Sequence, residues 1–416
     1  MELKFPLPSA IGSPASNLDY EERGRGERMP LQTKPIPSST FFSTVPLEIR
    51  TDILYITTFL KKHYGTKCYI VGGAVRDHLL GLECRDYDIE CYGISPELFE
   101  TAMERLGAQG VGRSFFVYKY HQLDIALPRK EKKTGAGHRG FDVTLATEER
   151  EASKRRDFTI NALMYDIEEE QILDYWQGLA DLDRKLLRVI DRVSFAEDSL
   201  RVLRAMQFAA RFGFKVENES CRVCRQIPLD DLPRERLFLE FEKMFRGDFP
   251  VYGLYYFLAL GIAQKLFSIE MDYQKFIKLS RGFCRSKKNF LEKLKPYYFL
   301  YIAAPYFDKE GRELLDRLGA PRIYYKKIAD VPLLPRSIDC AFVARVAHKE
   351  GVAGFVGNYH PRVKLLAQRL GVWDRPFDSG AIPAVLMAEG FEGKALGDEL
   401  AKQTEEKIRG LDEDCT

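Results

Sequence analysis

The feature that most constrains this chain is a pair of glycines at a strand-to-helix junction. Gly72 and Gly73 lie between a short β-prone run, 68–71, and a helical stretch that stops at Gly81. Two glycines let a backbone approach a ligand closely, and a helix N-terminus offers N–H groups to phosphate oxygens. Arg76, in the first turn, can add a charge-assisted contact. The junction therefore predicts binding of a phosphorylated ligand.

Two aspartates follow on the next predicted strand, 86–92. Asp86 and Asp88 are two residues apart, so both carboxylates point to the same face of a strand. Adjacent like charges repel, and a divalent cation such as Mg²⁺ removes that cost. Asp124, in the β-prone run 123–127, is the best candidate for a third carboxylate. Taken singly, each pattern is typical of a turn or a solvated strand end, but the ordered combination predicts a metal-assisted phosphoryl transfer site.

The pattern of elements predicts an α/β domain followed by an all-α region. Strand and helix signals alternate from about Val45 to Asp174, including a helix over 96–106 that Ser95 caps and Gly107 closes. Beyond Gly178 the strand signals fade and the sequence is mostly helical.

Composition and charge narrow the class of protein. The 416 residues are 45% hydrophobic, with 63 basic against 61 acidic residues, which excludes a globally basic nucleic-acid coat and a polyanionic disordered chain. A local basic excess lies in 184–246. Residues 1–45, rich in Pro, Ser and charge, predict a disordered arm. Neither a membrane-spanning run nor a signal peptide is recognised, so we expect a cytoplasmic protein.

A basic cluster follows the strand region. Arg155 and Arg156 precede Asp157, and Asn161 follows one turn later. Such a run alone is usually a solvated face. Beside a carboxylate, however, arginines can bind phosphate while the carboxylate accepts a ribose hydroxyl.

A second polar cluster lies on a predicted helix that ends at Gly213. Asp198 and Arg201 are three residues apart, and Arg204 lies one turn beyond. The simpler interpretation is an intrahelical ion pair worth ~0.2–0.5 kcal/mol. The alternative is base recognition, because an acceptor beside a donor complements the amino group and ring nitrogen of cytosine and adenine and mismatches uracil and guanine.

These clusters, in this order, resemble the class II nucleotidyltransferases of the polymerase-β superfamily, which include CCA-adding tRNA nucleotidyltransferases and bacterial poly(A) polymerases. The resemblance extends from Tyr69 to about Arg246. It implies a metal motif, a ribose-selecting motif, a hinge, an amino-acid template for CTP and ATP, and a motif that braces the template helix, at 72–88, 155–162, 174–181, 197–201 and 234–240 respectively.

The resemblance implies a seahorse-like molecule with a polymerase-β-like head at 46–178, a helical neck at 179–250, and a body and tail at 251–416. It further implies addition of CMP, CMP and AMP, from CTP and ATP, to the 3′ end of tRNA with Mg²⁺, and indicates no protein partner. The implied contacts are Asp86, Asp88 and Asp124 for the cation; Gly72, Gly73, Arg76, Arg156, Asp157 and Asn161 for phosphates and ribose; and Asp198, Arg201 and Arg204 for the base.

Several alternatives stay open. The stretch 130–149 resembles the flexible loop of CCA-adding enzymes and favours terminal A addition, whereas 111–115 partly resembles a poly(A) polymerase signature. An enzyme that adds only the final A would share these motifs. A non-catalytic RNA-binding relative should lose Asp86 or Asp88, and a small-molecule nucleotidyltransferase should lack the long helical half. The aromatic run 297–299 suits either base stacking or core packing, and core packing is favoured.

Overall fold

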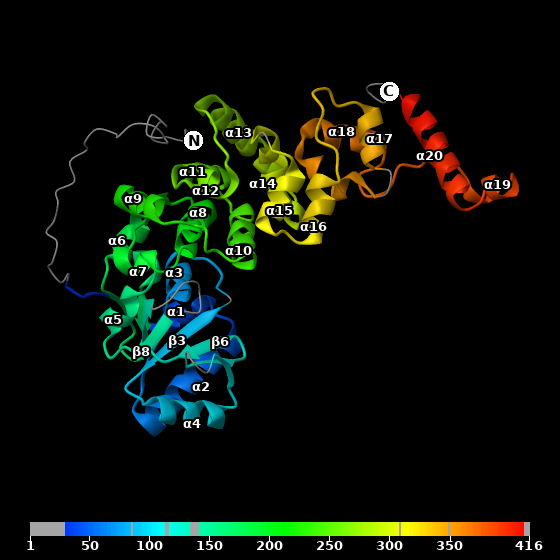
Figure 1. The fold of residues 1–416 in the computed structure, drawn as a ribbon. Helices are drawn as coiled ribbons and strands as arrows, with labels where there is room; N and C mark the ends of the chain where they lie inside the picture. The colour runs from blue at the N-terminus through cyan, green and yellow to red at the C-terminus, as the bar shows by residue number, and fades with distance from the viewer. Residues whose placement is uncertain are drawn as a thin grey trace. The chain divides into compact units, whose positions relative to one another are not determined.

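A computed structural model of the chain describes residues 30–84, 86–112, 116–133, 141–307, 309–347 and 350–411. The chain divides into two compact units, residues 1–232 and 233–416 (Figure 1). The boundary lies inside the segment expected to form a neck, 179–250. Each unit is described by itself below.

The first unit is built on an eight-stranded mixed sheet with the order β1-β10-β9-β2-β3-β6-β5-β4. Within this sheet as described, β3 and β6, the fifth and sixth strands in the order, form the only parallel pair. The strands are β1 Gln32–Pro35, β2 Lys67–Val71, β3 Tyr87–Tyr92, β4 Gln109–Gly112, β5 Val117–Tyr120, β6 Leu123–Ala126, β9 Met164–Asp166 and β10 Gln171–Asp174. A separate hairpin joins β7 Arg129–Lys133 to β8 Phe141–Leu145; the central part of the expected loop, 134–140, lies outside the described residues.

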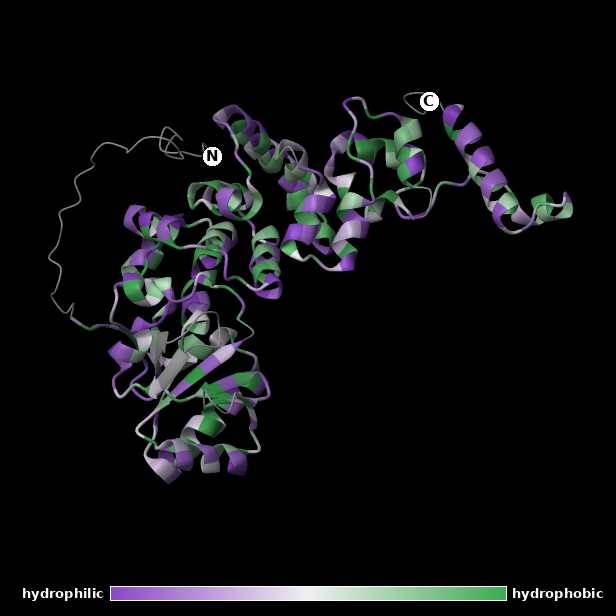
Figure 2. Cartoon of the chain, viewed as in Figure 1, coloured by the Kyte–Doolittle hydropathy of each residue, from purple (hydrophilic) through white to green (hydrophobic). Residues whose placement is uncertain are grey.

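Helices flank this sheet. Helix α2 (Leu47–Tyr64) and helix α4 (Pro96–Leu106) lie together below it in Figure 1, and α3 (Gly73–Leu79) lies above it. The expected caps of α4 are confirmed, since the Ser95 hydroxyl accepts the Leu98 N–H at 3.4 Å and Gly107 is left-handed at φ +72°. Alternation along β3 and β6 gives the sheet a buried apolar face and a polar face; Figure 2 shows the mixture of hydrophobic and hydrophilic positions.

The prediction of a disordered arm is wrong for residues 30–45, and residues 1–29 lie outside the described residues. Strand β1 pairs antiparallel with β10, and a short helix, α1 (Ser38–Phe41), follows. Phe41 is fully buried and stacks on Tyr165 with ring centroids 3.9 Å apart. The Pro-rich composition is compatible with an edge strand, and buried aromatic contacts offset the cost of ordering the segment.

A helical layer completes the first unit. It comprises α5 Glu149–Lys154, α6 Gly178–Asp183, α7 Arg192–Ala196, α8 Leu200–Phe212 and α9 Asn218–Gln226, with a two-stranded parallel ribbon of β11 Leu186–Leu187 and β12 Lys215–Val216. Helix α8 ends at Gly213, as predicted, in a left-handed cap at φ +69°. Ten of its thirteen residues are buried, so the helix forms the centre of this layer.

The second unit is helical, as expected. Its α-helices are α10 Arg234–Phe245, α11 Pro250–Ala259, α12 Ile262–Phe267, α13 Tyr273–Ser286, α14 Lys295–Ala303, α15 Gly311–Leu318, α16 Arg322–Tyr324, α17 Cys340–Val346, α18 Pro361–Arg369, α19 Pro383–Ala388 and α20 Gly393–Arg409. Aromatic rings of α10, α13 and α14 stack in its core, with Phe299 between Phe245 and Phe283. Within the described ranges, no helix is both long enough and apolar enough to cross a bilayer.

Candidate active site

Two aspartates face each other across the parallel strands at the centre of the sheet. Asp88 on β3 is the register partner of Asp124 on β6, and their neighbours Ile89 and Ile125 are fully buried on the opposite face. The side chains of Asp88 and Asp124 are 47% and 40% exposed. Asp86 is exposed just before β3 begins. The structure therefore brings two of the predicted carboxylates together and places the third at the entrance of the same strand.

This arrangement concentrates negative charge. Burial raises the pKa of Asp88, and Asp124 and Glu90 raise it further, while Arg156 and Arg155 act in the opposite direction. Carboxylate oxygens are the ligands that Mg²⁺ accepts, and Mg²⁺ in proteins is commonly held by one or two carboxylates together with waters and substrate phosphates. Among the described residues no complete set of three acidic, His or Cys side chains is already gathered. The facing pair fits a cation that completes its shell with substrate.

The two glycines bring the backbone beside an arginine. Gly72 ends β2 with φ +73°, and its N–H donates to the Leu163 carbonyl at 3.1 Å. A Cβ on Gly72 would lie 3.2 Å from Nη1 of Arg156. Gly73 then begins α3, with an added Cβ 3.4 Å from Nη2 of Arg76. A side chain at Gly72 would therefore crowd the Arg156 guanidinium, whereas one at Gly73 would make only ordinary contact with Arg76.

Arg76 lies in the interior of the first unit. It is 4% exposed; its Nε donates to Asp77 at 2.8 Å, its Nη1 donates to Asn161, and its guanidinium lies over the ring of Phe212 at 4.8 Å. Burial lowers the pKa of Arg76, and Asp77 opposes that shift. Tertiary packing has turned this first-turn arginine into the interior, where it packs on a ring of α8, and its phosphate contact stays a prediction.

Arg155 and Arg156 of the basic cluster are anchored by Glu90, a buried carboxylate on strand β3. Nη2 of Arg156 donates to Glu90 at 2.8 Å, and Nη2 of Arg155 donates to the same oxygen at 3.2 Å. Burial acts to raise the pKa of Glu90, but Arg156 and Arg155 outweigh it and lower that pKa. Nη1 of Arg156 is 3.9 Å from Asp88. Arg156 therefore lies where it can contact a ligand bound at the carboxylate pair.

Asp157 joins the sheet to helix α8. One of its oxygens accepts the N–H of Phe158 and the side-chain amide of Asn161, both at 2.8 Å, and the other accepts Nε of Arg204 at 2.5 Å. Burial acts to raise the pKa of Asp157, but Arg204, Asn161 and Arg201 outweigh it and lower that pKa. Both Asp157 and Asn161 are buried, so the predicted ribose contact stays a prediction.

Helix α8 presents its arginines to the sheet domain. Arg201 donates through Nη1 to the Ser194 carbonyl at 2.6 Å and through Nη2 to the Arg155 carbonyl at 2.7 Å. Asp198 lies two residues before the helix, not on it as expected, and its carboxylate accepts the N–H of Leu200 at 3.1 Å. Like Ser, Asn and Asp residues generally, it satisfies a donor at a helix start. Its base-reading role stays a prediction.

Two functional neighbours were missed by sequence reasoning. Glu90 continues the alternate spacing of Asp86 and Asp88, so period-2 alternation could have placed it on the same face. Arg211 donates to Asp77 at 2.8 Å and connects α8 to α3. The available sequence signal was that Arg211 lies two helical turns beyond Arg204, and therefore on the same face of the helix.

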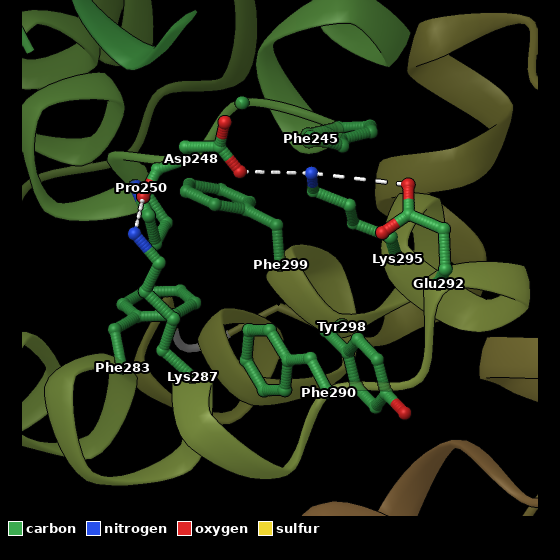
Figure 3. Close-up of a pocket in the computed structure, with 11 residues that line it drawn as sticks. Phe245, Asp248, Pro250, Phe283, Lys287, Phe290, Glu292, Lys295, Tyr298 and Phe299 are labelled. Atoms are coloured by element: carbon green, nitrogen blue, oxygen red, sulfur yellow. Dashed lines mark hydrogen bonds and ion pairs between the residues drawn. The ribbon is translucent and has the colours of Figure 1, made fainter.

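The second unit contains a pocket of its own (Figure 3). Aromatic rings and two lysines dominate its lining, which includes Phe245, Phe283, Phe290, Tyr298, Phe299, Lys287 and Lys295. Both lysines donate to Asp248. Lys295 donates to the Asp248 carboxylate at 2.9 Å, and Lys287 donates to the Asp248 backbone carbonyl. Tyr298 and Phe299 are 1% and 3% exposed, which confirms core packing for these two residues of the run 297–299. None of the predicted nucleotide-binding residues lines this pocket.

Comparison with known proteins agrees with this geometry. Residues 68–188 match the family described as the poly(A) polymerase head domain. The Thermotoga maritima CCA-adding enzyme complexed with tRNA is 23% identical, with a TM-score of 0.65 over 91% of this chain and 96% of that chain. The Bacillus stearothermophilus CCA-adding enzyme in complex with CTP is 22% identical, with a TM-score of 0.61 over 86% of this chain and 93% of that chain.

A further solved structure, a tRNA nucleotidyltransferase complexed with a primer tRNA and an incoming ATP analog, is 27% identical, with a TM-score of 0.52 over 65% of this chain and 81% of that chain. The sheet domain is therefore similar to the poly(A) polymerase head domain over residues 68–188. The chain around it has the fold of the CCA-adding enzymes, which confirms the resemblance and the fold class predicted from the sequence.

Proposed function

We propose that this protein is a template-independent RNA nucleotidyltransferase that adds CCA to the 3′ end of tRNA, using CTP, ATP and Mg²⁺, in the cytoplasm. The observation that carries the proposal is the facing pair of Asp88 and Asp124 beside Arg156, in a head domain whose fold is that of the CCA-adding enzymes. The acceptor arm of the tRNA would contact the helical segments 179–250 and 251–416.

Different residues of the sheet domain would bind the cation and the triphosphate. Asp88 and Asp124, with Asp86 at the strand entrance, would hold the cation, which when bound lowers the pKa of the RNA 3′-hydroxyl and neutralises the triphosphate. Arg156 would bind a phosphate, since it is anchored at Glu90 and still lies 3.9 Å from Asp88. Gly72 would let the triphosphate approach this guanidinium, because a side chain there would lie against it, and Gly73 would let the backbone approach the ligand closely.

Nucleotide selection would come from the start of helix α8. Arg201 uses one N–H on each Nη to bind the carbonyls of Ser194 and Arg155, whereas a guanidinium has five N–H donors. The remaining donors and an oxygen of Asp198 would match the base edges of cytosine and adenine and mismatch those of uracil and guanine. Arg204 and Asp157 would fix the helix against the head, through their 2.5 Å contact.

The test is a transfer assay on three tRNA transcripts that lack CCA, end in C, or end in CC. Each is offered CTP and ATP, singly and together, with Mg²⁺, and the products are sized on a gel. We expect all three to be completed to CCA. Extension of the CC-ending tRNA alone by one A would assign an A-adding enzyme, and long A tails on any RNA would assign a poly(A) polymerase; either result overturns CCA addition.

The same assay tests the carboxylate pair. Asp88→Asn keeps the shape of the side chain but removes a charged ligand, so we expect transfer to fall by about 10³-fold or more. Glu168→Gln is the matched control, because it makes the same change of charge at a carboxylate that pairs with Lys61 at 2.6 Å and has no assigned contact to ligand; its activity should stay within a few-fold of the original. A folded Asp88→Asn protein with full activity would contradict the cation assignment.

A further inference from the structure

A buried carboxylate lies behind the predicted nucleotide site. Glu90 is 3% exposed on β3, two residues after Asp88, and therefore on the same face of the sheet. Its Oε1 accepts hydrogen bonds from Nη2 of Arg156 at 2.8 Å and from Nη2 of Arg155 at 3.2 Å, while its Oε2 accepts the Tyr92 hydroxyl at 3.1 Å. One carboxylate thus holds two consecutive arginines, and burial makes the loss of either charge expensive.

This carboxylate competes with Asp88 for Arg156. The guanidinium makes a charge-assisted hydrogen bond to Glu90 at 2.8 Å, whereas its distance to Asp88 is 3.9 Å. If Glu90 were replaced by Gln, Arg156 would keep its ion pair with Asp88, at 3.9 Å, as a contact to a carboxylate on this face. Arg156 would then move onto a carboxylate that is needed for the cation, and both the phosphate contact and the cation site would weaken.

The other arginine connects Glu90 to base selection. The side chain of Arg155 is tied to Glu90, and the backbone carbonyl of Arg155 accepts Nη2 of Arg201 at 2.7 Å. The position of the predicted base-reading guanidinium therefore depends on where Arg155 is held. Among the described contacts, this is a continuous hydrogen-bonded path from β3 to the start of helix α8.

We propose that Glu90 is a positioning residue for nucleotide transfer: it keeps Arg156 off Asp88 and holds Arg155 in register with Arg201. The proposal rests on the proposed function of the same site. It predicts that a residue without any assigned contact to substrate controls the affinity for nucleotide, the affinity for cation and the discrimination among bases.

The test compares Glu90→Gln with Glu90→Asp. We expect Glu90→Gln to raise KM for CTP and ATP by about 10-fold or more while kcat at saturation falls less, and to increase the incorporation of UTP relative to CTP. Binding of Mn²⁺, followed by electron paramagnetic resonance without nucleotide or RNA, should weaken several-fold. Glu90→Asp keeps the charge and should restore part of each property. Should the Gln variant fail to fold, the same measurements on the Asp variant decide.

Two variants serve as matched controls. Asp166→Asn removes the charge of a buried carboxylate on β9 that pairs with Lys67 at 3.0 Å. Tyr92→Phe removes the hydroxyl bonded to Glu90 but leaves both arginines in place. Both should keep KM and base selection within about twofold.

Three outcomes would overturn the role of Glu90: a folded Glu90→Gln protein with unchanged KM, selectivity and Mn²⁺ affinity; equal effects of Asp166→Asn; or equal effects of Glu90→Asp and Glu90→Gln. The wild-type reaction on tRNA is measured alongside. If the wild type adds neither C nor A, the proposed function fails, and the Mn²⁺ comparison still decides whether Glu90 keeps Arg156 off Asp88.

Discussion

At the scale of single residues, the site depends on buried charges that are each matched by an opposite charge. Each of three carboxylates pairs with one or two guanidinium groups. The pairs are Glu90 with Arg155 and Arg156, Asp157 with Arg204, and Asp77 with Arg76 and Arg211. Removing one partner of such a pair leaves an uncompensated charge, which costs more than the pair contributes. Stability and function are therefore coupled in the head domain.

The pair of Asp157 and Arg204 gives a prediction about pH. Arg204→Gln removes the largest influence that lowers the pKa of Asp157, and burial then raises that pKa. We expect the free energy of unfolding to fall by about 1–3 kcal/mol at pH 7, below the range for a fully buried pair because the Arg204 side chain is 34% exposed. A carboxyl group whose pKa is lower in the folded than in the unfolded state stabilises the fold at pH values above its unfolded-state pKa. This stabilisation is lost as the pH falls through its folded-state pKa.

The difference between the two proteins should therefore be greatest near neutral pH. It should shrink as the pH falls through the raised pKa of Asp157 in the variant, and vanish below the lowered pKa of Asp157 in the original protein. Chemical unfolding followed by circular dichroism at several pH values measures it. In an Asp157→Asn background, Arg204→Gln should produce a difference that does not change with pH. A pH-independent difference in the original background would refute the assignment to Asp157.

At the scale of elements, the segment that connects the sheet to the helical layer is fixed by one glycine. Asp174 accepts the N–H groups of Trp176, Gly178 and Leu179, at 3.0, 2.9 and 2.9 Å, and α6 begins directly at Gly178. A Cβ on Gly178 would lie 2.4 Å from the Thr159 carbonyl oxygen, a backbone atom that cannot move away alone. The turn that the resemblance assigns to a hinge is closely packed in this structure.

Gly178→Ala should therefore destabilise the protein by about 1–3 kcal/mol or more, since the added methyl forces the backbone apart. The control is Gly282→Ala in α13, where an added Cβ meets nothing within 4 Å; there alanine should stabilise the helix by about 0.5–1 kcal/mol. Thermal and urea unfolding of the two variants should move in opposite directions. A neutral Gly178→Ala would show that the turn yields easily.

The same scale shows what the sequence could predict. Local signals placed β3 and α4 with their caps, because alternation and capping act over a few residues. They could not predict that residues 32–35 join the sheet, since β1 pairs with β10 far along the chain. Nor could they show that Arg76 turns inward, because its partner rings lie on α8. Asp124 was chosen from the sequence as the best candidate for a third carboxylate, and only the register of β3 on β6 showed that it faces Asp88.

At the scale of the whole molecule, the predicted roles divide along the two units. Each predicted cation, phosphate, ribose and base contact lies before residue 232, within the first unit. The ion pairs that join the sheet to helix α8 are internal to this unit as well. The second unit has its own aromatic core and contributes none of the predicted nucleotide contacts. Nucleotide binding should therefore be separable from most of the RNA binding.

We expect a fragment of residues 30–232 to bind CTP and ATP within a few-fold of the full chain, while its affinity for tRNA falls by about 10-fold or more. The physical reason is that RNA affinity grows with the number of phosphates neutralised by Lys and Arg, whereas nucleotide affinity depends on a compact set of contacts. Calorimetry with CTP and fluorescence anisotropy with labelled tRNA measure the two affinities. The salt dependence of tRNA binding should also be shallower for the fragment, because fewer counterions are released.

Circular dichroism establishes that the fragment is folded. A folded fragment that no longer binds CTP would show that the second unit completes the nucleotide site, and one that binds tRNA as tightly as the full chain would confine the RNA contacts to the first unit.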